Sequence, residues 1–323
     1  MKAARDLSLE TIRLQQDDRV LTAIYASPPV NMADARFLRE LDLLTKAVDR
    51  DPSVGAVVLT GGIRGRFLTH ADPGEIGAFA AMPHPVMPMG LVEPGLRVQN
   101  AVLRLPGLTR LVERFGGAAG SGLVWGYRWK RTILRMNRSG AVYLAAINGP
   151  TVGGGQELAL ACDLRYAADA PYVRMGQIEI LAGQIPGGGG TQRLPGMIGT
   201  GRAIEHMLEG APIDARAALG LGLVHRLVAP EDLLAETQAT AARMSRRQRT
   251  AIAALKRSVY FGTRRKLGRG LDMELSGFIA SALTRPSGKA LGVLNADIER
   301  LGDSPFLADP GPWIEGTRVK QVP

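Results

Sequence analysis

The stretch AAINGPTVGGGQELALACDLRYAADAPYVRMGQIEILAGQIPGGGGTQRL, residues 145–194, decides the fold. The strand-like run YLAAI at 143–147 leads into a glycine-rich turn, and an apolar helix is expected from about Gln156. A second strand-like run, DLRYAA at 163–168, follows the helix. Strands that alternate with helices are typical of an α/β fold.

The glycine turn itself suggests a binding function. Three consecutive glycines, Gly153 to Gly155, let the backbone approach a ligand closely, and the N-terminus of the next helix offers unpaired N–H groups with a partial positive charge. Such a turn can stabilise an oxyanion. It is not a nucleotide-binding loop, because no Gly-Lys-Ser/Thr follows and neither glycine run matches G-x-G-x-x-G.

The α/β pattern extends to both sides of this stretch. Strands are predicted at 19–25 and 54–60 around a helix that Asn31 could cap, with one apolar face. That face carries Leu41, Leu44 and Val48. Further on, GRAIEHMLEG reads as a short helix closed by Gly210, and Asp214 caps another.

We therefore divide the chain into an α/β core at 1–230 and a segment at 231–323 that is helical to about residue 300 and ends in an irregular tail. Residues 77–133 interrupt the core with Pro- and Gly-rich pieces and two tryptophans, Trp125 and Trp129. This insertion is either a cover over a site or a surface elaboration with local helices packed on the body.

Composition narrows the class of protein. The chain has 323 residues and no uncharged apolar run of about 18, and its first residues are charged, so we expect a soluble cytoplasmic protein. The single cysteine, Cys162, lies in an apolar run and is interpreted as a buried, inert thiol.

A net charge of +10 predicts attraction to anions. The densest basic run lies between Arg243 and Arg269, where a solvated helical face and a phosphate-binding role are both consistent with the pattern. Few aromatic side chains, Tyr260 and Phe261, interleave these charges, which disfavours nucleic acid as the partner.

Two carboxylates stand beside the glycine-rich turns. Glu157 follows the first turn directly, and Glu179 comes 22 residues later (179 − 157), before a second glycine-rich loop. Acidic residues near helix starts are common on protein surfaces, so the spacing alone does not make them catalytic. In an apolar cleft, however, such a pair could exchange protons with water and with a carbon acid.

The sequence resembles the enoyl-CoA hydratase/isomerase, or crotonase, family. The resemblance rests on the strings AAINGPTVGGGQELALACDLRYA and GQIEILAGQIPGGGGTQRLPGMIG, with VGAVVLTGG and FLTHADPGEI before them and ALGLGLVHRLVAPEDLL and AALKRSV after them. It covers about residues 8–76 and 134–260, and leaves the insertion and the tail outside.

The resemblance implies a spiral of β-β-α units with a C-terminal helical segment that helps form trimers or hexamers. It implies an acyl-CoA or enoyl-CoA substrate, with no metal or redox cofactor, and a hydratase reaction. The thioester oxygen would accept hydrogen bonds from the backbone N–H groups of Ala71 and Gly154. Glu157 would activate the water, and Glu179 would deliver a proton to the α-carbon. The implied substrate contacts are Phe67, His70, Asp72, Gly153 and Gly187.

Some positions depart from the family pattern. His70 replaces a glycine before Ala71, Gln156 stands where small residues or Cys are frequent, and the segment between Asp72 and Asn148 is long. An isomerase or a hydrolase acting on CoA thioesters is the alternative within the family. An RNA-binding or scaffolding role is the alternative outside enzymology.

Overall fold

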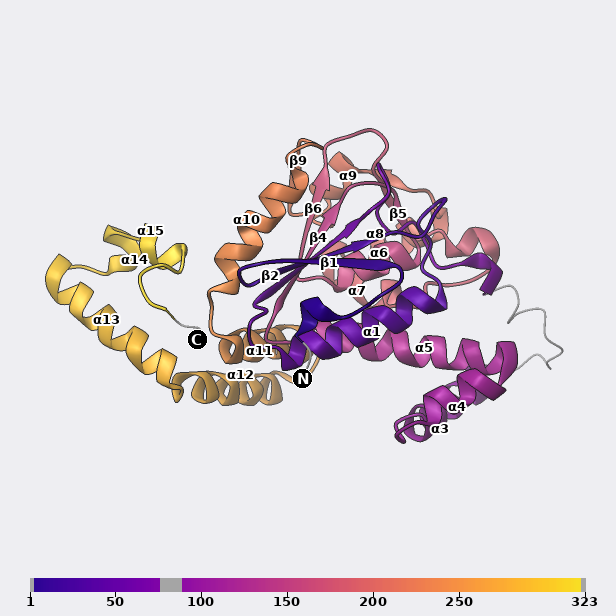
Figure 1. Cartoon of the computed structure of the whole chain (residues 1–323), viewed down its shortest axis with the longest axis horizontal. Helices are drawn as coiled ribbons and strands as arrows, with labels where there is room; N and C mark the ends of the chain where they lie inside the picture. Colours follow the sequence, from indigo (N-terminus) through magenta and orange to yellow (C-terminus); the bar gives the residue numbers. More distant parts are fainter. Residues whose placement is uncertain (1–2, 76–88, 321–323) are drawn as a thin grey trace.

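Two β-sheets organise the chain, which the computed structural model describes for residues 3–75 and 89–320 (Figure 1). The larger sheet has six strands in the order β1-β2-β3-β4-β6-β9. Its first pair is antiparallel, and all its other neighbours are parallel. Its strands are β1 (Ile12–Asp17), β2 (Val20–Tyr25), β3 (Ala56–Gly61), β4 (Val142–Ile147), β6 (Leu164–Ala168) and β9 (Arg226–Val228).

The smaller sheet has the order β5-β7-β8. Its strands are β5 (Thr151–Val152), β7 (Arg174–Gly176) and β8 (Ile213–Asp214). Along the chain, β4 of the large sheet is followed by β5 of the small one and then by α6, and β6, β7 and α7 repeat this order. The chain therefore alternates between the sheets, which confirms the expected α/β fold built from β-β-α units.

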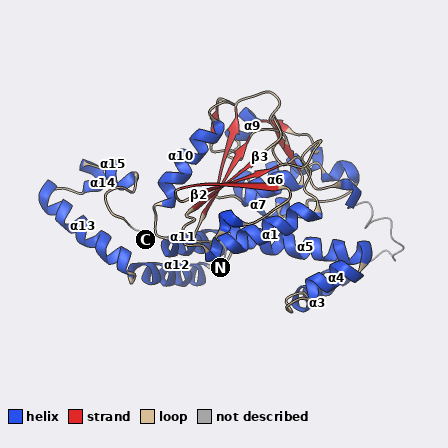
Figure 2. Ribbon diagram, viewed as in Figure 1, coloured by secondary structure: helices blue, strands red, loops and turns tan. Residues whose placement is uncertain are grey.

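Helices surround the sheets (Figure 2). After the short 3₁₀ turn η1 (Ala4–Asp6), they are α1 (Ala35–Arg50), α3 (Met89–Val102), α4 (Leu108–Phe115), α5 (Gly117–Met136), α6 (Gly154–Ala161), η2 (Glu179–Ala182), α7 (Gly190–Ile198), α8 (Thr200–Glu209), α9 (Ala215–Gly220), α10 (Leu233–Ser245), α11 (Arg249–Arg257), the π-helical turn η3 (Ser258–Gly262), α12 (Leu267–Ala282), α13 (Arg285–Leu301), α14 (Pro305–Ala308) and α15 (Gly311–Ile314). Among them, α10 packs on β2, β3 and β4, and Gln238 donates a hydrogen bond of 2.9 Å to Thr22 of β2.

The predicted apolar face of α1 is confirmed, but its predicted cap is wrong. Leu41, Leu44 and Val48 are buried. The N-cap is Asp34, which accepts a hydrogen bond from the N–H of Phe37 at 2.8 Å. Asn31 instead has a positive φ of 62°, and its buried amide donates to the carbonyls of Tyr25 and Phe67. Contacts of the Asn31 side chain with the backbone of Tyr25 and of the distant residue Phe67 hold it away from the helix, and Asp34 caps the helix instead.

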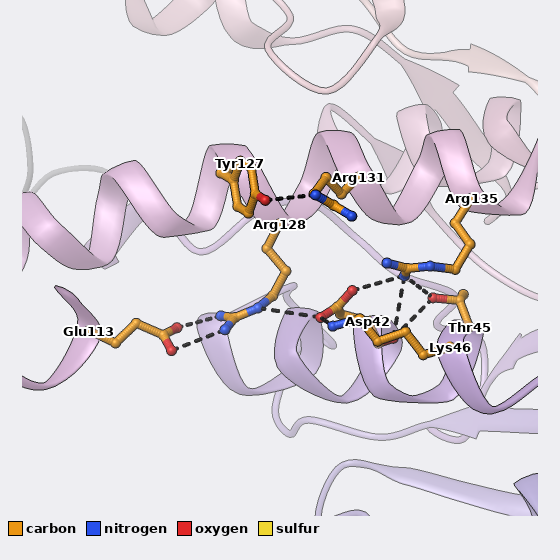
Figure 3. A network of polar contacts seen from close by, with 8 residues as sticks. All are labelled: Asp42, Thr45, Lys46, Glu113, Tyr127, Arg128, Arg131 and Arg135. Atoms are coloured by element: carbon orange, nitrogen blue, oxygen red, sulfur yellow. Dashed lines mark hydrogen bonds and ion pairs between the residues drawn. The ribbon is translucent and has the colours of Figure 1, made fainter. Parts of the chain in front are cut away.

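The insertion forms helices that pack on the body. Its first residues, 77–88, lie outside the described part of the chain, and α3, α4 and α5 follow. Helix α5 lies along α1 (Figure 1). Asp42 of α1 joins them, because its carboxylate accepts hydrogen bonds from Lys46 at 2.6 Å and from Arg135 of α5 at 2.8 Å (Figure 3). Burial raises the pKa of Asp42, but these contacts outweigh it and hold the pKa below its ordinary value.

The same network reaches α4. Arg128 of α5 forms a bidentate pair with Glu113 of α4 and lies 3.9 Å from Asp42 (Figure 3). These contacts fix α5 at a defined position on the core, which matters because α5 also borders the candidate site.

Helices α12 to α15 extend away from the sheets (Figure 1). The predicted irregular tail contains two single-turn helices, α14 and α15, and is tied to the body: Arg246 donates to the carbonyl of Glu315 at 2.8 Å, and Arg247 donates to that of Trp313 at 2.9 Å. None of the helices in the described ranges combines the length and the apolar character needed to cross a bilayer.

Candidate active site

The glycine turn after β4 brings two free backbone amides together. Gly153 has a φ of 51°, and α6 starts at the next residue, two positions before the predicted Gln156. A Cβ placed on Gly154 would lie 3.4 Å from the backbone N of Ala71, so the two segments touch. Within the described chain, neither the Ala71 N–H nor the Gly154 N–H donates to a backbone or side-chain acceptor.

Close backbone contact explains the glycines of this turn. A Cβ on Gly155 would overlap the carbonyl oxygen of Leu68, and one on Gly153 would lie 3.1 Å from the Oε1 atom of Glu179. The turn is therefore pressed against both the 68–71 loop and one of the two predicted acids. Two unpaired N–H groups held in this way are suited to receive a carbonyl oxygen that gains negative charge.

Glu157 is enclosed by the second glycine-rich loop. It is 3% exposed, and its Oε1 atom accepts hydrogen bonds from the N–H groups of Gly188 at 2.7 Å and Gly190 at 2.8 Å. Burial raises the pKa of Glu157 to about 7; the hydrogen bonds oppose this rise, and the charge of Glu179 adds to it. A carboxyl group with this pKa can take up or release a proton near neutral pH.

Glu179 begins η2, and one of its carboxyl oxygens lies against Gly153. Its other oxygen, Oε2, is buried and has no hydrogen-bond partner in the described chain. Burial also raises the pKa of this group above its ordinary value. The carboxyl is therefore able to hold a proton and has an atom from which to transfer it.

His70 occupies the position before Ala71 without backbone strain. The non-glycine residues with positive φ among those described are Asp18 and Asn31, so His70 needs no left-handed conformation. Its Nδ1 atom lies 2.7 Å from the carbonyl oxygen of Ala71. The ring thus braces the loop that carries one of the two free amides.

The other predicted substrate contacts lie in different surroundings. The carboxylate of Asp72 accepts a hydrogen bond from the N–H of Gly74 at 2.7 Å, which is a local structural role. Gly187 lines a cavity of about 1120 Å³ beside Glu157, with open space where a Cβ would stand. Phe67 does not line this cavity; its side chain is 2% exposed and lies in the hydrophobic core. The structure thus gives no support to a contact between the Phe67 side chain and substrate.

Trp129 of α5 belongs to the site, a role that the sequence did not reveal. Its Nε1–H donates to the carbonyl of Gly188 at 3.0 Å, and its ring stacks on Trp125 with centroids 5.2 Å apart. A Cβ on Gly188 would overlap both Glu157 and Trp129, so this glycine, the acid and the indole are in direct contact. The signal was weak, because 59 residues separate Trp129 from Gly188.

A pair of buried amides joins the segments that carry the two acids. Gln177 donates to Gln156 at 2.6 Å, and both side chains are at most 1% exposed. Gln156 precedes Glu157 directly, and Gln177 stands two positions before Glu179. The bond therefore fixes the position of one acid-bearing segment relative to the other.

Taken together, the site offers two amide donors, two carboxyl groups of raised pKa and an adjoining cavity. No group of three His, Cys, Asp or Glu side chains in ranges 3–75 and 89–320 is arranged to hold a metal ion. The arrangement can stabilise an enolate-like oxygen and move protons to and from carbons next to it.

Known proteins share this architecture. The sequence model of enoyl-CoA hydratase/isomerase matches residues 127–285. A probable enoyl-CoA hydratase of Mycobacterium tuberculosis is 30% identical over 269 residues, which are 83% of this chain and 88% of that protein. The chain belongs to the enoyl-CoA hydratase/isomerase family. A crotonyl-CoA hydratase of Syntrophomonas wolfei is 28% identical over 84% of this chain and 90% of its own.

Solved structures of the family show the same fold. An enoyl-CoA hydratase from Geobacillus kaustophilus matches with a TM-score of 0.72 at 22% identity, over 90% of this chain and 96% of its own. One from Bacillus anthracis matches with a TM-score of 0.69 at 24% identity, over 91% and 98%. The expected crotonase fold is confirmed.

Proposed function

We propose that this member of the family is an enoyl-CoA hydratase, which adds water across the 2,3 double bond of an enoyl-CoA thioester. The observation that carries the proposal is the meeting of Glu157 and Glu179, both with raised pKa, beside the free amides of Ala71 and Gly154. Family relatives named as hydratases support it.

The steps of the reaction follow from the positions of the two amides and the two acids. The thioester oxygen accepts hydrogen bonds from the N–H groups of Ala71 and Gly154, which stabilise the negative charge that it gains as water attacks C3. Glu157 takes a proton from that water while the oxygen bonds to C3. Glu179 gives a proton to C2, so the product carries the O–H and the H of one water molecule. The acid pair carries one proton before and after the addition.

The side chains of the basic run offer little support for an RNA-binding role. Lys256 pairs with Asp163 at 2.6 Å, and Arg249 donates to the carbonyl of Val48 at 3.0 Å. Tyr260 donates to Asp163 at 2.9 Å, and Arg138 lies 4.7 Å from the centre of the Phe261 ring. Much of this run is thus engaged within the protein, and Arg138 covers one face of the Phe261 ring.

Product analysis with a trans-2-enoyl-CoA tests the proposal. The expected result is loss of the enoyl absorbance with formation of the 3-hydroxyacyl-CoA. Migration of the double bond without water addition would identify an isomerase, and release of free coenzyme A would identify a hydrolase. Either outcome would contradict the hydratase assignment.

A further inference from the structure

If the proposed function holds, the residues beside the two acids determine the direction in which the acyl chain of the substrate extends from them. Ala71 and Gly154 mark the thioester carbonyl, and Glu179, against Gly153, marks C2. Glu157, against Gly188, marks C3. Carbons beyond C3 therefore run toward Gly188 and Trp129, which line the 1120 Å³ cavity.

This cavity is large, and its walls combine apolar side chains with cations such as Arg193, which lies beside Gly189. Side chains of α3 and α5, including Leu96, Leu123 and Ile133, line it with Trp129. Its volume of about 1120 Å³ is at the upper end of what small-molecule sites provide. It has room for an acyl group much longer than the four carbons of crotonyl-CoA.

Beyond the apolar walls, the cavity meets a strongly cationic groove. Tyr127, Lys130 and Leu134 line both the cavity and this second hollow of about 790 Å³, which we call the basic groove. Its charged residues are the cations Arg104, Lys130, Arg131, Arg135, Arg138, Arg249 and Arg257 and one acid, Asp49.

The positive charge of the basic groove is largely uncompensated. Arg135 pairs with Asp42 (Figure 3), and Arg249 donates to backbone carbonyls. The other five cations form no ion pair with any described carboxylate. The residues outside the described ranges include no Asp or Glu. Asp49, the one acid in the groove, accepts a hydrogen bond from Ser139 at 2.6 Å. Clustered cations repel one another, so a bound anion would stabilise the groove.

One of these cations is already held in place. The guanidinium of Arg131 donates to the hydroxyl of Tyr127 at 2.8 Å and lies 5.4 Å from the centre of its ring (Figure 3). A positioned guanidinium binds a carboxylate with less loss of side-chain freedom than a mobile one, and its planar fork matches the two oxygens.

We propose that the acyl group of the substrate ends in a carboxylate, and that the basic groove binds this end. The substrate class is the mono-coenzyme A thioester of an unsaturated dicarboxylic acid. Its apolar middle lies along Leu96, Leu123 and Trp129, and its carboxylate reaches the basic groove, where Arg104, Lys130 and Arg131 bind it. The basic groove thus selects the far end of a substrate whose thioester end is held at Ala71 and Gly154.

The test compares two length series of trans-2-enoyl-CoA thioesters, one methyl-ended and one carboxyl-ended, with the full-length chain. At the best length, we expect kcat/KM to be about tenfold or more higher for the carboxyl-ended member, as for a hydrogen-bonded charged pair. Arg131→Met and, separately, Arg104→Met should reduce this ratio. Arg202→Met is the matched control: Arg202 is exposed on α8 and lines neither hollow, so the ratio should stay at the wild-type value.

Two results would overturn the proposal. One is a wild-type preference for methyl-ended substrates at every length. The other is an equal loss for both series in Arg131→Met and Arg104→Met with weaker binding of free coenzyme A, which would assign the groove to the coenzyme A phosphates. If the wild type hydrates neither series, the proposed function fails by itself. The affinities of saturated methyl-ended and carboxyl-ended acyl-CoA, measured by calorimetry, would then test separately whether the basic groove binds a carboxylate. We expect the carboxyl-ended acyl-CoA to bind more tightly.

Discussion

At the scale of single residues, Glu157 shows how the fold adjusts an ordinary side chain. A carboxyl group that is nearly sealed from water is costly to ionise, and two backbone N–H groups only partly offset that cost. The same burial that prepares Glu157 for proton transfer at neutral pH must therefore weaken the folded state when the group is charged.

This leads to a prediction for stability. The pKa of Glu157 is about 7 in the folded state, above its unfolded value, so the folded protein binds more protons between the two values and its free energy of unfolding falls as pH rises through that range. Glu157→Gln cannot ionise and keeps an acceptor for Gly188 and Gly190. The free energy of unfolding of the variant minus that of the wild type should therefore increase by up to about 3 kcal/mol as the pH is raised from 4 to 8. Urea unfolding at both pH values measures this, and a difference that does not change with pH would refute it.

His70 supplies a second prediction. Its ring contacts the carbonyl of Ala71, while the proposed donor to the substrate is the N–H of Ala71. Losing one hydrogen bond that supports the loop should cost no more than about twofold in kcat/KM, so His70→Gly keeps most of the hydration activity. If activity instead fell as far as in variants of the two acids, with thioester binding preserved, His70 would be a catalytic residue.

At the scale of elements, the sequence predicts local features better than distant ones. Leu41, Leu44 and Val48 follow the helical period, and the Asp214 cap, which accepts from Ala217 N at 2.8 Å, needs only a three-residue offset. Gly188 lies 31 residues from Glu157, and no local pattern predicts that their loops are in contact. Before the structure, only the resemblance to a family placed both loops at one site.

The contribution of α5 was beyond the reach of the sequence. The two tryptophans marked the insertion without indicating which way it packs. That direction depends on long-range contacts such as Arg135 with Asp42, across 93 residues, and Trp129 with Gly188. The cavity and the basic groove arise from this placement, and no local pattern of the insertion shows them.

The insertion should set chain-length preference. Leu96 of α3 lines the cavity, so Leu96→Trp should fill part of it and lower kcat/KM for long-chain enoyl-CoA more than for crotonyl-CoA. Leu111→Trp on α4 is the control, since Leu111 is 54% exposed and does not line the cavity. A length profile measured by loss of enoyl absorbance gives the comparison. An unchanged profile in a folded Leu96→Trp variant would leave the insertion as a surface elaboration only.

At the scale of the whole molecule, the C-terminal helices present apolar side chains to solvent. Phe278 in α12 is 65% exposed, and Leu283, at the end of that helix, is 82% exposed. Leu307 in the tail is 78% exposed. A surface of this kind favours contact with another chain. On this ground, together with the family resemblance, we propose that the protein is a homotrimer or a hexamer of paired trimers.

Sedimentation equilibrium tests that proposal. The wild type should have the mass of three or six chains, and Phe278→Glu should shift the distribution toward smaller species, because a charge would then be buried in the interface. The exposed residue Leu208 of α8, changed to Glu, is the matched control and should leave the mass unaltered. A wild-type monomer at micromolar concentration would contradict the expectation.

We propose that Glu157 and Glu179 carry out hydration together, and variants of the two acids test this. The hydration rate of a trans-2-enoyl-CoA is compared for the wild type, Glu157→Gln and Glu179→Gln, with the affinity of each for free coenzyme A measured alongside. We predict that each variant loses about a hundredfold or more in kcat while coenzyme A affinity stays near the wild-type value, because the amide keeps the shape of the side chain but cannot exchange the proton. Substantial hydration by either variant would contradict the two-acid mechanism.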